Sequence, residues 1–502
     1  MKLDILLKGI EYHLQQGSPE NCEITGLCED SRKIKCGNLF FCRTGTHTSG
    51  KRYLRQALSL GAAAVICEKY DEDSRRILSS QKDICVIETD VSAQTQARLA
   101  SNFYDFSKEK LLLIGVTGTK GKTTVCAMLQ KLFLDNHMLC ATVGTNGFFL
   151  KDRVAKSSHT TPELFELYGF IAEAVKAGCT HFIAEVSSLA VKQGRIAGLT
   201  FDLGIFTNIY PDHIGGNEHA SFLEYAYWKK RFFENCKKVL LNRDDPFSFE
   251  IAADKNGVCS WYSASVCADG YASEIEKDVE VDGLYQHFLW HWQKMPARSI
   301  SLKLPGLCNV SNAAAALSAF CLLTSDEQYD SYQLDFSTFS VRGRFEMVGH
   351  FQGGTIMIDY AHNEVSTRSV LTTLMEYHPK RLICVYGGGG NRSKLRRYDM
   401  GEVTGEMADL CVLTCDNPRD EEIRDINNDI KVGLARSNGK YIEIDDRKEA
   451  IAYCMKNAKP GDMIVLLGKG HEDYQEIKGV KYHFDEREAV AEILDEMKAG
   501  KR

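Results

Sequence analysis

The chain has 502 residues, which is too long for one hydrophobic core and corresponds to about three domains at roughly 150 residues each. Its 44% hydrophobic and 26% charged residues are typical of soluble globular proteins and exclude disordered and fibrous classes. Lys and Arg total 61 against 68 Asp and Glu, a formal charge of −7, and there is no basic tail. Nucleic acid is therefore not an expected partner.

The cysteines and the apolar runs indicate the cellular compartment in which the protein is expected. No long apolar run follows Met1-Lys2-Leu3-Asp4, so no signal peptide is predicted. Apolar runs such as 111–116 and 463–467 are far shorter than the roughly 20 residues of a membrane helix. The 18 cysteines are scattered and form no Cys-x-x-Cys pair, which favours reduced thiols over disulfides or zinc. We therefore expect a cytoplasmic protein with no membrane partner.

The first region extends to about residue 108 and mixes short strands with helical stretches. Asp30-Ser31-Arg32 lies in a polar turn before the apolar run 38–41, and the apolar run 61–66 predicts a strand that follows a helix. The polar segment 101–110 is the expected boundary.

From residue 109 to about 338, apolar strands alternate with amphipathic helices. A strand expected at 111–117 leads into a glycine-rich turn. The helix beyond it has apolar residues at the spacing of one buried face: Val125, Met128, Leu129, Leu132 and Phe133. Further strands are expected at 181–186, 202–208 and 238–242. Asp282-Gly283 between apolar residues is a hairpin signal, so the later part of this sheet is expected to be antiparallel.

The polar stretch 325–338 marks a second boundary. The last region, 339–502, has expected strands at 355–358, 382–386, 410–414 and 463–467, and helical patterns such as 370–377 and 489–497 separate some of them. This alternation predicts a second open, mostly parallel sheet. The expected fold class is therefore α/β.

The strongest chemical signal is the segment Gly118-Thr119-Lys120-Gly121-Lys122-Thr123-Thr124, between a strand and a helix. Glycines let successive N–H groups face a phosphate, and the helix N-terminus adds partial positive charge. Lys122 is expected to reach the β- and γ-phosphates, and the Thr123 hydroxyl is expected to bind Mg²⁺. Val116 stands where a strict P-loop has glycine, so this is a shortened variant. Its context makes an ordinary glycine-rich turn the weaker alternative.

Polar residues recur at the ends of predicted strands, where open α/β sheets bind ligands. Glu185 and Asp212-His213 follow strands of the central region and suit a metal ion near a triphosphate, although each alone is weak evidence. Four clusters close strands in the last region: 359–362, 387–392, 416–419 and 468–473. Arginine beside carboxylate is what a zwitterionic amino acid requires. The residues alone therefore predict an ATP-using enzyme with a polar small-molecule site shared between two domains.

Taken in order, these motifs resemble those of the Mur ligases of peptidoglycan synthesis. The resemblance runs from Asp30-Ser31-Arg32 to Phe484-Asp485-Glu486-Arg487. Between them lie residues 117–124, Thr160-Thr161-Pro162, 185–188, Thr207-Asn208, Asp212-His213, 304–306, 309–312, 343–346 and 359–362. It implies three domains: a UDP-nucleotide-binding domain at 1–108, a central P-loop ATPase domain with a mostly parallel sheet at 109–338, and a Rossmann-like amino-acid-binding domain at 339–502.

The resemblance also implies roles for single residues. ATP would be bound by Gly118, Thr119, Lys120, Gly121, Lys122, Thr123, Thr124, Asn309, Arg344, Asp359 and His362. The UDP-linked muramoyl peptide would contact Ser31, Thr46, His47, Thr48, Thr160, Thr161, Ser187, Gln193 and Arg195. Two Mg²⁺ ions would be served by Thr123, Glu185, His213 and Lys229, and the catalytic set would be Lys122, Glu185, His213 and Lys229. The amino acid would be held by Arg392, Asp416, Asn417, Pro418, Arg419, Gly468 and Glu472.

Lys229 matches the lysine that is carbamylated in this family. A carbamate turns an ammonium into an anion with two oxygens, which can bind Mg²⁺. From the residues alone, a solvated helix lysine beside Lys230 and Arg231 is the favoured alternative. The family match favours the carbamate.

The implied activity is an ATP-dependent, ADP-forming ligase, a monomer, that adds meso-diaminopimelate to UDP-MurNAc-L-Ala-D-Glu through an acyl phosphate. The sequence at 416–419 resembles that of diaminopimelate-adding members, whose substrate has a carboxylate that lysine lacks. Leu189, Pro211 and Asn391 depart from the family pattern. A lysine-adding enzyme, or a diverged paralogue with another carboxylate acceptor, therefore stays open. A nucleotide-binding protein without turnover is disfavoured, because all four catalytic residues are present.

Overall fold

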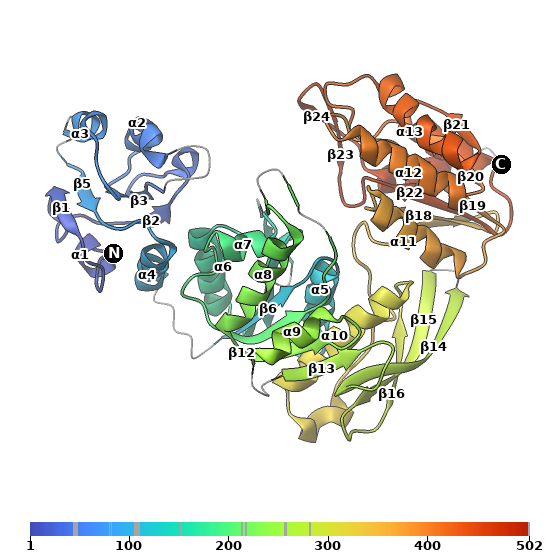
Figure 1. The fold of residues 1–502 in the computed structure, drawn as a ribbon, viewed down its shortest axis with the longest axis horizontal. Helices are drawn as coiled ribbons and strands as arrows, with labels where there is room; N and C mark the ends of the chain where they lie inside the picture. The colour runs from blue at the N-terminus through green and yellow to red at the C-terminus, as the bar shows by residue number, and fades with distance from the viewer. Residues whose placement is uncertain are drawn as a thin grey trace. The chain divides into compact units, whose positions relative to one another are not determined.

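The computed structural model describes residues 1–43, 49–79, 81, 83–104, 111–150, 152–157, 159–211, 214–215, 218–255, 259–280 and 283–499. The chain divides into two compact units. The first contains Met1–Tyr271, Trp292–Met295 and Asn312–Gln333, and the second contains Ala272–His291, Pro296–Ser311 and Leu334–Arg502. Strands and helices alternate in both (Figure 1), which confirms the expected α/β class.

The N-terminal part of the first unit is a five-stranded sheet. In spatial order its strands are β1 (His13–Gln16), β5 (Cys85–Glu88), β4 (Ala64–Cys67), β3 (Asn38–Phe41) and β2 (Gly26–Cys28). All neighbours are parallel except the antiparallel pair β1 and β5. Its helices are α1 (Leu3–Leu6), α2 (Leu54–Ser59), α3 (Glu72–Ser79) and α4 (Ala93–Tyr104), with 3₁₀ turns η1 (Ser31–Lys33) and η2 (Gly50–Tyr53). Alternate strand residues pack against α4 on one face and against α2 and α3 on the other.

An eleven-stranded sheet follows in the chain. In spatial order its strands are β16 (Arg298–Leu302), β15 (Gly283–Trp292), β14 (Gly270–Glu280), β13 (Cys259–Ser263), β12 (Cys236–Asn242), β11 (Phe201–Phe206), β6 (Leu112–Thr117), β10 (His181–Glu185), β7 (Cys140–Gly144), β8 (Gly147–Phe149) and β9 (Arg153–Ala155). The strands from β14 to β7 are parallel, whereas β15 and β16 are antiparallel, as are β7, β8 and β9. The four strands expected here coincide with β6, β10, β11 and β12, and the antiparallel later part is confirmed. The hairpin residues 281–282 lie outside the described residues.

Helices cover this sheet: α5 (Lys122–Asp135), α6 (Leu164–Lys176), α7 (Ser188–Lys192), α8 (Phe222–Phe232), α9 (Phe247–Ala253) and α10 (Leu307–Leu323), with η4 (Phe233–Asn235) and η5 (Asp326–Ser331). All five apolar residues expected on one face of α5 are buried. One of them, Phe133, stacks on His181 at the start of β10, with ring centroids 4.0 Å apart. The amphipathic pattern therefore fixes α5 against the sheet, with its N-terminus at the glycine-rich loop.

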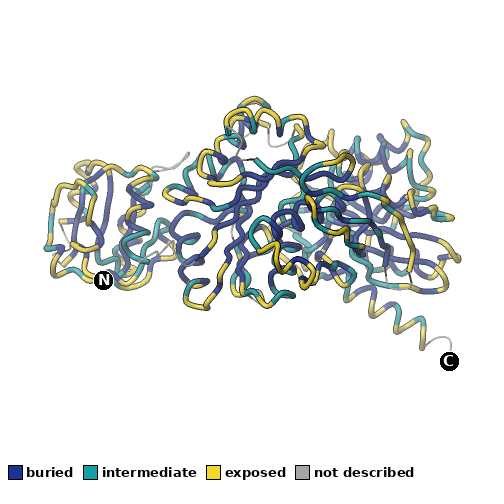
Figure 2. The backbone as a smooth tube through the Cα atoms, turned by 90° about the horizontal axis from the view of Figure 1, so that it is seen from below, coloured by how far each residue is buried: buried dark blue, intermediate teal, exposed yellow. Residues whose placement is uncertain are grey.

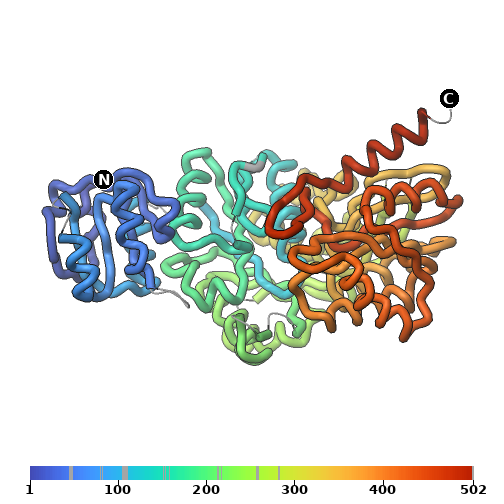
Figure 3. Tube along the Cα trace, turned by 90° about the horizontal axis from the view of Figure 1, so that it is seen from above, coloured from blue at the N-terminus to red at the C-terminus, as the bar shows by residue number. Residues whose placement is uncertain are grey.

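The second unit contains a six-stranded sheet whose spatial order is β17 (Glu346–Phe351), β18 (Gly354–Asp359), β22 (Asp462–Leu467), β19 (Arg381–Tyr386), β20 (Leu410–Leu413) and β21 (Tyr441–Glu443). Only β17 and β18 are antiparallel, so the mostly parallel sheet is confirmed. One face packs against α11 (Glu364–Met375), α12 (Lys394–Met407) and α13 (Ile423–Ser437), and the other packs against α14 (Arg447–Lys456) and α15 (Glu486–Ala499). Figure 2 shows buried backbone in the interior of the chain and exposed backbone at its surface, and Figure 3 shows α15 running on towards the C-terminus. A hairpin, β23 (Tyr474–Ile477) and β24 (Val480–His483), follows β22.

Two general features of the chain complete the description. None of the described helices has the length and apolarity that a bilayer crossing requires. All 18 cysteines fall within the described residues and carry free thiols.

A partly desolvated carboxylate, Glu29, lies where the N-terminal sheet meets the central part of the first unit. Gln96 donates a hydrogen bond to its Oε2 at 2.9 Å, while its Oε1 is buried and has no hydrogen-bond partner among the described residues. Burial and, to a smaller extent, the nearby charge of Glu163 raise the pKa of the Glu29 carboxyl to about 7, against the opposing effects of the Gln96 hydrogen bond, Arg43 and Arg195. The folded state therefore binds a proton that the unfolded chain releases at lower pH.

We expect Glu29→Gln to stabilise the protein at pH 8 and to have little effect at pH 5. Because the folded pKa is raised, the contribution of Glu29 to stability falls as the pH rises from about 4.5 to about 7. The amide removes this penalty, which is on the order of 1–3 kcal/mol at pH 8. Thermal unfolding followed by circular dichroism at both pH values measures it. The exposed Glu23→Gln is the control, and an equal shift at the two pH values would contradict the assignment.

Candidate active site

The glycine-rich segment forms a loop between β6 and α5, as expected. Gly118 has a φ of +150° and Gly121 a φ of +87°, both in the region that favours glycine. A Cβ at Gly118 would lie 1.8 Å from Thr207 Oγ1, and one at Gly121 would lie 2.4 Å from Asn312 Oδ1. Both positions therefore require glycine, and α5 begins immediately beyond them at Lys122. This is the geometry of an anion site at a helix N-terminus.

The segment after β11 forms hydrogen bonds that hold the glycine-rich loop in place. The carbonyl oxygen and Oδ1 of Asn208 accept hydrogen bonds from the Thr119 and Lys120 amides, both at 2.9 Å. Thr207 donates from Oγ1 to the Lys120 carbonyl at 2.6 Å. Lys122 Nζ donates to the carbonyls of Gly118 at 2.9 Å and Thr119 at 3.1 Å. The ammonium is therefore held at the loop, next to the position where phosphates would lie.

Glu185, at the end of β10, is buried beside the start of α5. Its Oε1 accepts hydrogen bonds from Thr123 Oγ1 and from the Thr145 amide, both at 2.9 Å. A Cβ at Gly144 would lie 2.0 Å from that oxygen, so glycine makes room for the carboxylate. Burial raises the pKa of Glu185, and the charge of Lys122 lowers it in part. A carboxylate and a hydroxyl this close are ligands that Mg²⁺ prefers, so these residues fit the expected ion.

Lys229 is on α8 and is only 1% exposed. Its Nζ donates to the Gly118 carbonyl at 2.8 Å and lies 4.6 Å from the centroid of the Tyr225 ring. The alternative of a solvated helix lysine is therefore wrong, because the ammonium faces the phosphate loop. Its neighbour Lys230 is more exposed and pairs with Asp254 at 2.8 Å. The other expected metal ligand, His213, lies outside the described residues, as does Asp212.

Several residues expected on the acceptor path lie around the end of β10. Thr161 Oγ1 donates to the Glu185 carbonyl at 2.8 Å and accepts from the Ser187 amide at 3.0 Å. Arg195, also buried, donates to the Thr161 carbonyl at 2.9 Å. Thr160 Oγ1 lies 3.2 Å from Thr145 Oγ1. The structure thus brings these four expected residues close to the expected metal ligand Glu185.

The remaining acceptor residues are more dispersed. Ser31 is buried in η1 and donates to Gln56 Oε1 at 2.7 Å. The Gln193 carbonyl accepts from Arg43 Nη2 at 2.6 Å, which joins the N-terminal sheet to the segment after α7. Thr46, His47 and Thr48 lie outside the described residues.

Four residues expected near the nucleotide belong to the second unit: Asn309, Arg344, Asp359 and His362. Asp359, at the end of β18, accepts hydrogen bonds from the amides of Phe345 at 2.9 Å and Ala361 at 2.8 Å. Burial raises the pKa of Asp359, and the charge of Arg344 lowers it in part. His362 Nδ1 lies 2.7 Å from the Tyr360 carbonyl. Asn309 donates to the Pro305 carbonyl at 2.7 Å at the start of α10.

Six of the seven expected amino-acid-binding residues line one cavity of about 110 Å³ in the second unit: Arg392, Asp416, Asn417, Arg419, Gly468 and Glu472. Pro418 is not among its lining residues. Tyr360, His362, Arg396 and Arg397 also line it. Residues from the ends of four different strands therefore converge on one small polar pocket, as the clusters in the sequence indicated.

Two charged residues that the sequence did not single out contact residues that line this pocket. Lys469 is fully buried, and its Nζ lies 3.4 Å from Asp416 Oδ1 and 3.5 Å from Glu472 Oε2. Glu476, on β23, accepts from Arg419 Nε at 3.1 Å. Lys469 belongs to a cluster that the sequence identified, whereas no sequence signal pointed to Glu476. The pocket therefore brings carboxylates and guanidinium groups together, which suits a zwitterion.

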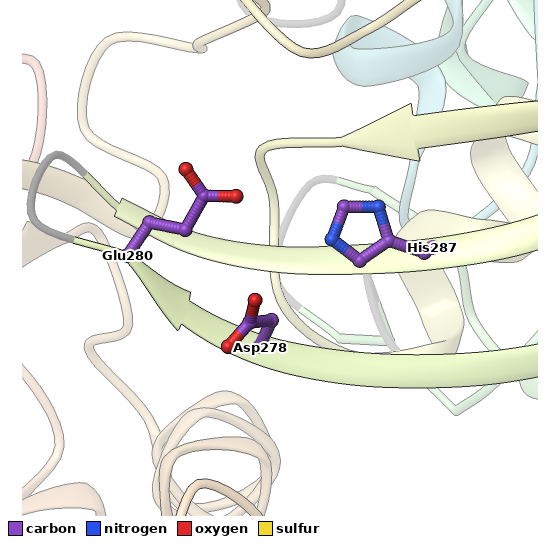
Figure 4. Close-up of side chains that lie close together, drawn as sticks. All are labelled: Asp278, Glu280 and His287. Atoms are coloured by element: carbon purple, nitrogen blue, oxygen red, sulfur yellow. The ribbon is translucent and has the colours of Figure 1, made fainter.

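Two other features contain none of the expected site residues. A larger cavity, of about 900 Å³, is lined in part by Glu11, His13 and Arg98 in the N-terminal part. Among the described residues, Asp278, Glu280 and His287 form a group on β14 and β15 whose potential ligand atoms lie within 4.8 Å of one another (Figure 4). Both carboxylates are exposed, and no further observation points to an ion there.

Three family models match the chain. They are the Mur ligase family, catalytic domain, at residues 23–104; the Mur ligase middle domain, at 116–320; and the Mur ligase, glutamate ligase domain, at 343–470. The matches follow the N-terminal sheet, the phosphate-loop region and the second unit's sheet.

Full-length relatives agree with these models. A UDP-N-acetylmuramoyl-L-alanyl-D-glutamate--2,6-diaminopimelate ligase from Caldanaerobacter subterraneus subsp. tengcongensis is 38% identical over 497 residues, covering 99% of each chain. The enzyme of the same name from Cytophaga hutchinsonii is 36% identical, covering 94% of this chain and 95% of the relative. A solved structure of an enzyme of that name is 27% identical, with a TM-score of 0.66 and 99% of both chains covered.

The resemblance inferred from the motifs is thus confirmed, together with the three-domain fold of the solved relatives. Members of this family are ATP-dependent ligases that form amide bonds. The chain belongs to the Mur ligase family and is an enzyme of this type.

Proposed function

We propose that this ligase adds meso-diaminopimelate to UDP-MurNAc-L-Ala-D-Glu in the synthesis of a peptidoglycan precursor. The observation that carries the proposal is the small pocket in which Arg392 and Arg419 lie near Asp416 and Glu472. Relatives at 36–38% identity are named for the same reaction. The domain boundaries at 108 and 338, a monomeric state and a cytoplasmic location belong to the same proposal.

The reaction consists of two displacements. The terminal carboxylate of the acceptor attacks the γ-phosphate of ATP, which forms an acyl phosphate and releases ADP. An amine of diaminopimelate then attacks the acyl carbon, and phosphate leaves as the amide forms and the nitrogen loses a proton. In this proposal Lys122, which is bound to the loop carbonyls, and the N-terminus of α5 neutralise charge that develops on the phosphates.

The proposed metal ligands are Thr123, Glu185, His213 and Lys229, the last as a carbamate. Mg²⁺ bound there would supply positive charge to the phosphate oxygens. The 2.9 Å contact between Thr123 Oγ1 and Glu185 supports the pair as ligands. The buried position of Lys229 at the phosphate loop supports its modification, because an anion there would face the expected ions.

The pocket favours diaminopimelate over lysine. Diaminopimelate carries a carboxylate and an ammonium at the end that does not react, whereas lysine carries only an ammonium. A bound lysine would offer no carboxylate at its unreacting end to Arg392 and Arg419. This is the physical reason to prefer the first substrate.

The proposal predicts ATP-dependent phosphate release only when both UDP-MurNAc-L-Ala-D-Glu and meso-diaminopimelate are present. A coupled phosphate assay compares meso-diaminopimelate, L-lysine and no amino acid. Release with lysine alone would identify a lysine-adding enzyme. No phosphate release with any of the amino acids, from a protein that still binds ATP, would favour a paralogue with a different acceptor.

For Lys229, we expect Lys229→Ala to lose activity by about 10²–10³-fold, as for the loss of one electrostatic group at a transition state. Short carboxylic acids added to the assay should restore part of it, because they can replace the carbamate oxygens. Lys230→Ala is the matched control and should keep near wild-type turnover, since this side chain pairs with Asp254 at the surface. Full activity of Lys229→Ala would refute the carbamate.

A further inference from the structure

Arg397 is a buried cation that the proposed reaction does not use. It is on the first turns of α12 and is 2% exposed, although Arg396 beside it is exposed. A buried guanidinium is costly unless carboxylates and carbonyls pair with it. The groups that pair with the Arg397 guanidinium therefore indicate its role.

Those partners come from two loops and one helix. Arg397 Nη1 and Nη2 donate to the two carboxylate oxygens of Glu421 at 2.8 and 2.7 Å, a bidentate pair. Nη1 also donates to Asp429 of α13 at 2.9 Å, and Nη2 donates to the Gly389 carbonyl at 3.0 Å. This pairing lowers the pKa of Glu421 to about 2. One guanidinium thus joins the loop after β19 to the loop after β20.

The two joined loops carry the arginines of the amino-acid pocket. Arg392 follows the glycines of the first loop, and Arg419 is in the second. The loops touch directly: Arg419 Nη1 donates to the Gly390 carbonyl at 2.8 Å, and a Cβ at Gly390 would lie 1.8 Å from the Pro418 carbonyl. The spacing between the loops therefore sets the spacing between the arginines.

Backbone strain indicates that this arrangement must be held in place. Arg419 has a φ of +51°, a left-handed conformation that is uncommon for a bulky residue and needs support from its surroundings, whereas Asn391, with a φ of +55°, is of a type that adopts it more readily. The Asn391 amide donates to Glu421, the same carboxylate that Arg397 binds. Glu421 therefore links Arg397 to Asn391, the residue immediately before Arg392.

We propose that Arg397 is a positioning residue that fixes the separation of Arg392 and Arg419, and with it the selection of an amino acid with a second carboxylate. Its Nη groups are already bound to Glu421, Asp429 and Gly389, so it acts through the loops. The inference rests on the proposed function, since the pocket must be the diaminopimelate site.

The test is a steady-state comparison of wild type and Arg397→Lys, which keeps the charge and removes the bidentate pair. We expect the KM for meso-diaminopimelate to rise about 10- to 100-fold, the range for loss of a charge-assisted bidentate contact. The kcat and the KM values for ATP and the UDP-linked acceptor should stay within about threefold. A role confined to stability would instead lower kcat by reducing the active fraction and leave all KM values unchanged.

Arg381→Lys is the matched control. Arg381 stands at the opposite end of β19 and forms its own two-point pair with Asp462, with Nε 3.0 Å from Oδ1. Its replacement should cost stability without changing the KM for diaminopimelate. An equal rise in that KM in both variants would overturn the positioning role.

Glu421→Gln provides a second route should Arg397→Lys fold poorly. It should raise the same KM, and the double variant should be no worse than the more affected single variant, because both changes break one contact. Additive effects, or a KM that does not change in either variant, would overturn the proposal. Failure of the proposed function is distinct, because then wild type itself would show no diaminopimelate-dependent release.

Discussion

Two ammonium groups, of Lys122 and Lys229, converge on one acceptor, the carbonyl oxygen of Gly118, at 2.9 and 2.8 Å. Like charges this close repel each other, and the repulsion is strong where water is excluded. The site around the phosphate loop is therefore built for an anion. A bound triphosphate would reduce the repulsion by supplying negative charge. Conversion of Lys229 into a carbamate would remove one of the two positive charges. Both belong to the proposed reaction.

Gly118 can present that carbonyl only because of its backbone. At a φ of +150°, with Thr207 packed against the place of a Cβ, the residue cannot be anything but glycine. The neighbouring strand end supplies Thr207 and Asn208, which hold the loop from the other side. The parallel order of β10, β6 and β11 brings Glu185, the loop and Asn208 to the same edge of the sheet.

In the second unit, buried arginines hold the ends of the strands in place. Arg447, on α14, donates to the carbonyls of Cys415 at 3.3 Å and Leu467 at 2.8 Å and pairs with Glu486. Those carbonyls immediately precede Asp416 and Gly468, which line the amino-acid pocket. Arg447 therefore holds one pair of strand ends, while Arg397 holds the loops after β19 and β20. In both places a buried cation replaces the regular hydrogen bonds that the strands no longer provide once they end.

Sequence patterns predicted the elements well because apolar periodicity and glycine placement are local properties. They located β6, β10, β11 and β12, the buried face of α5 and the phosphate loop. They wrongly favoured a solvated Lys229, and they gave no prediction for Arg397. Each residue lies in a charged helical segment, which is a pattern typical of an exposed helix face. The carboxylates that bury Arg397 come from 24 and 32 residues further along the chain. Such partners are brought together only by the tertiary fold, so single-sequence reasoning has no access to them.

Under the proposed function, the pocket would discriminate between amino acids through the charges that its residues offer to the substrate. Lys469 offsets one of the two carboxylates of Asp416 and Glu472, which leaves room for one ammonium. Glu476 pairs with Arg419, and under the proposal Arg392 would bind the carboxylate at the unreacting end of the substrate. A substrate end with one charge of each sign would pair with both the carboxylates and the arginines, whereas a lone ammonium would pair only with the carboxylates. Discrimination between two amino acids of similar length would then come from the cost of leaving a partly desolvated guanidinium without a carboxylate, and not from the shape of the pocket.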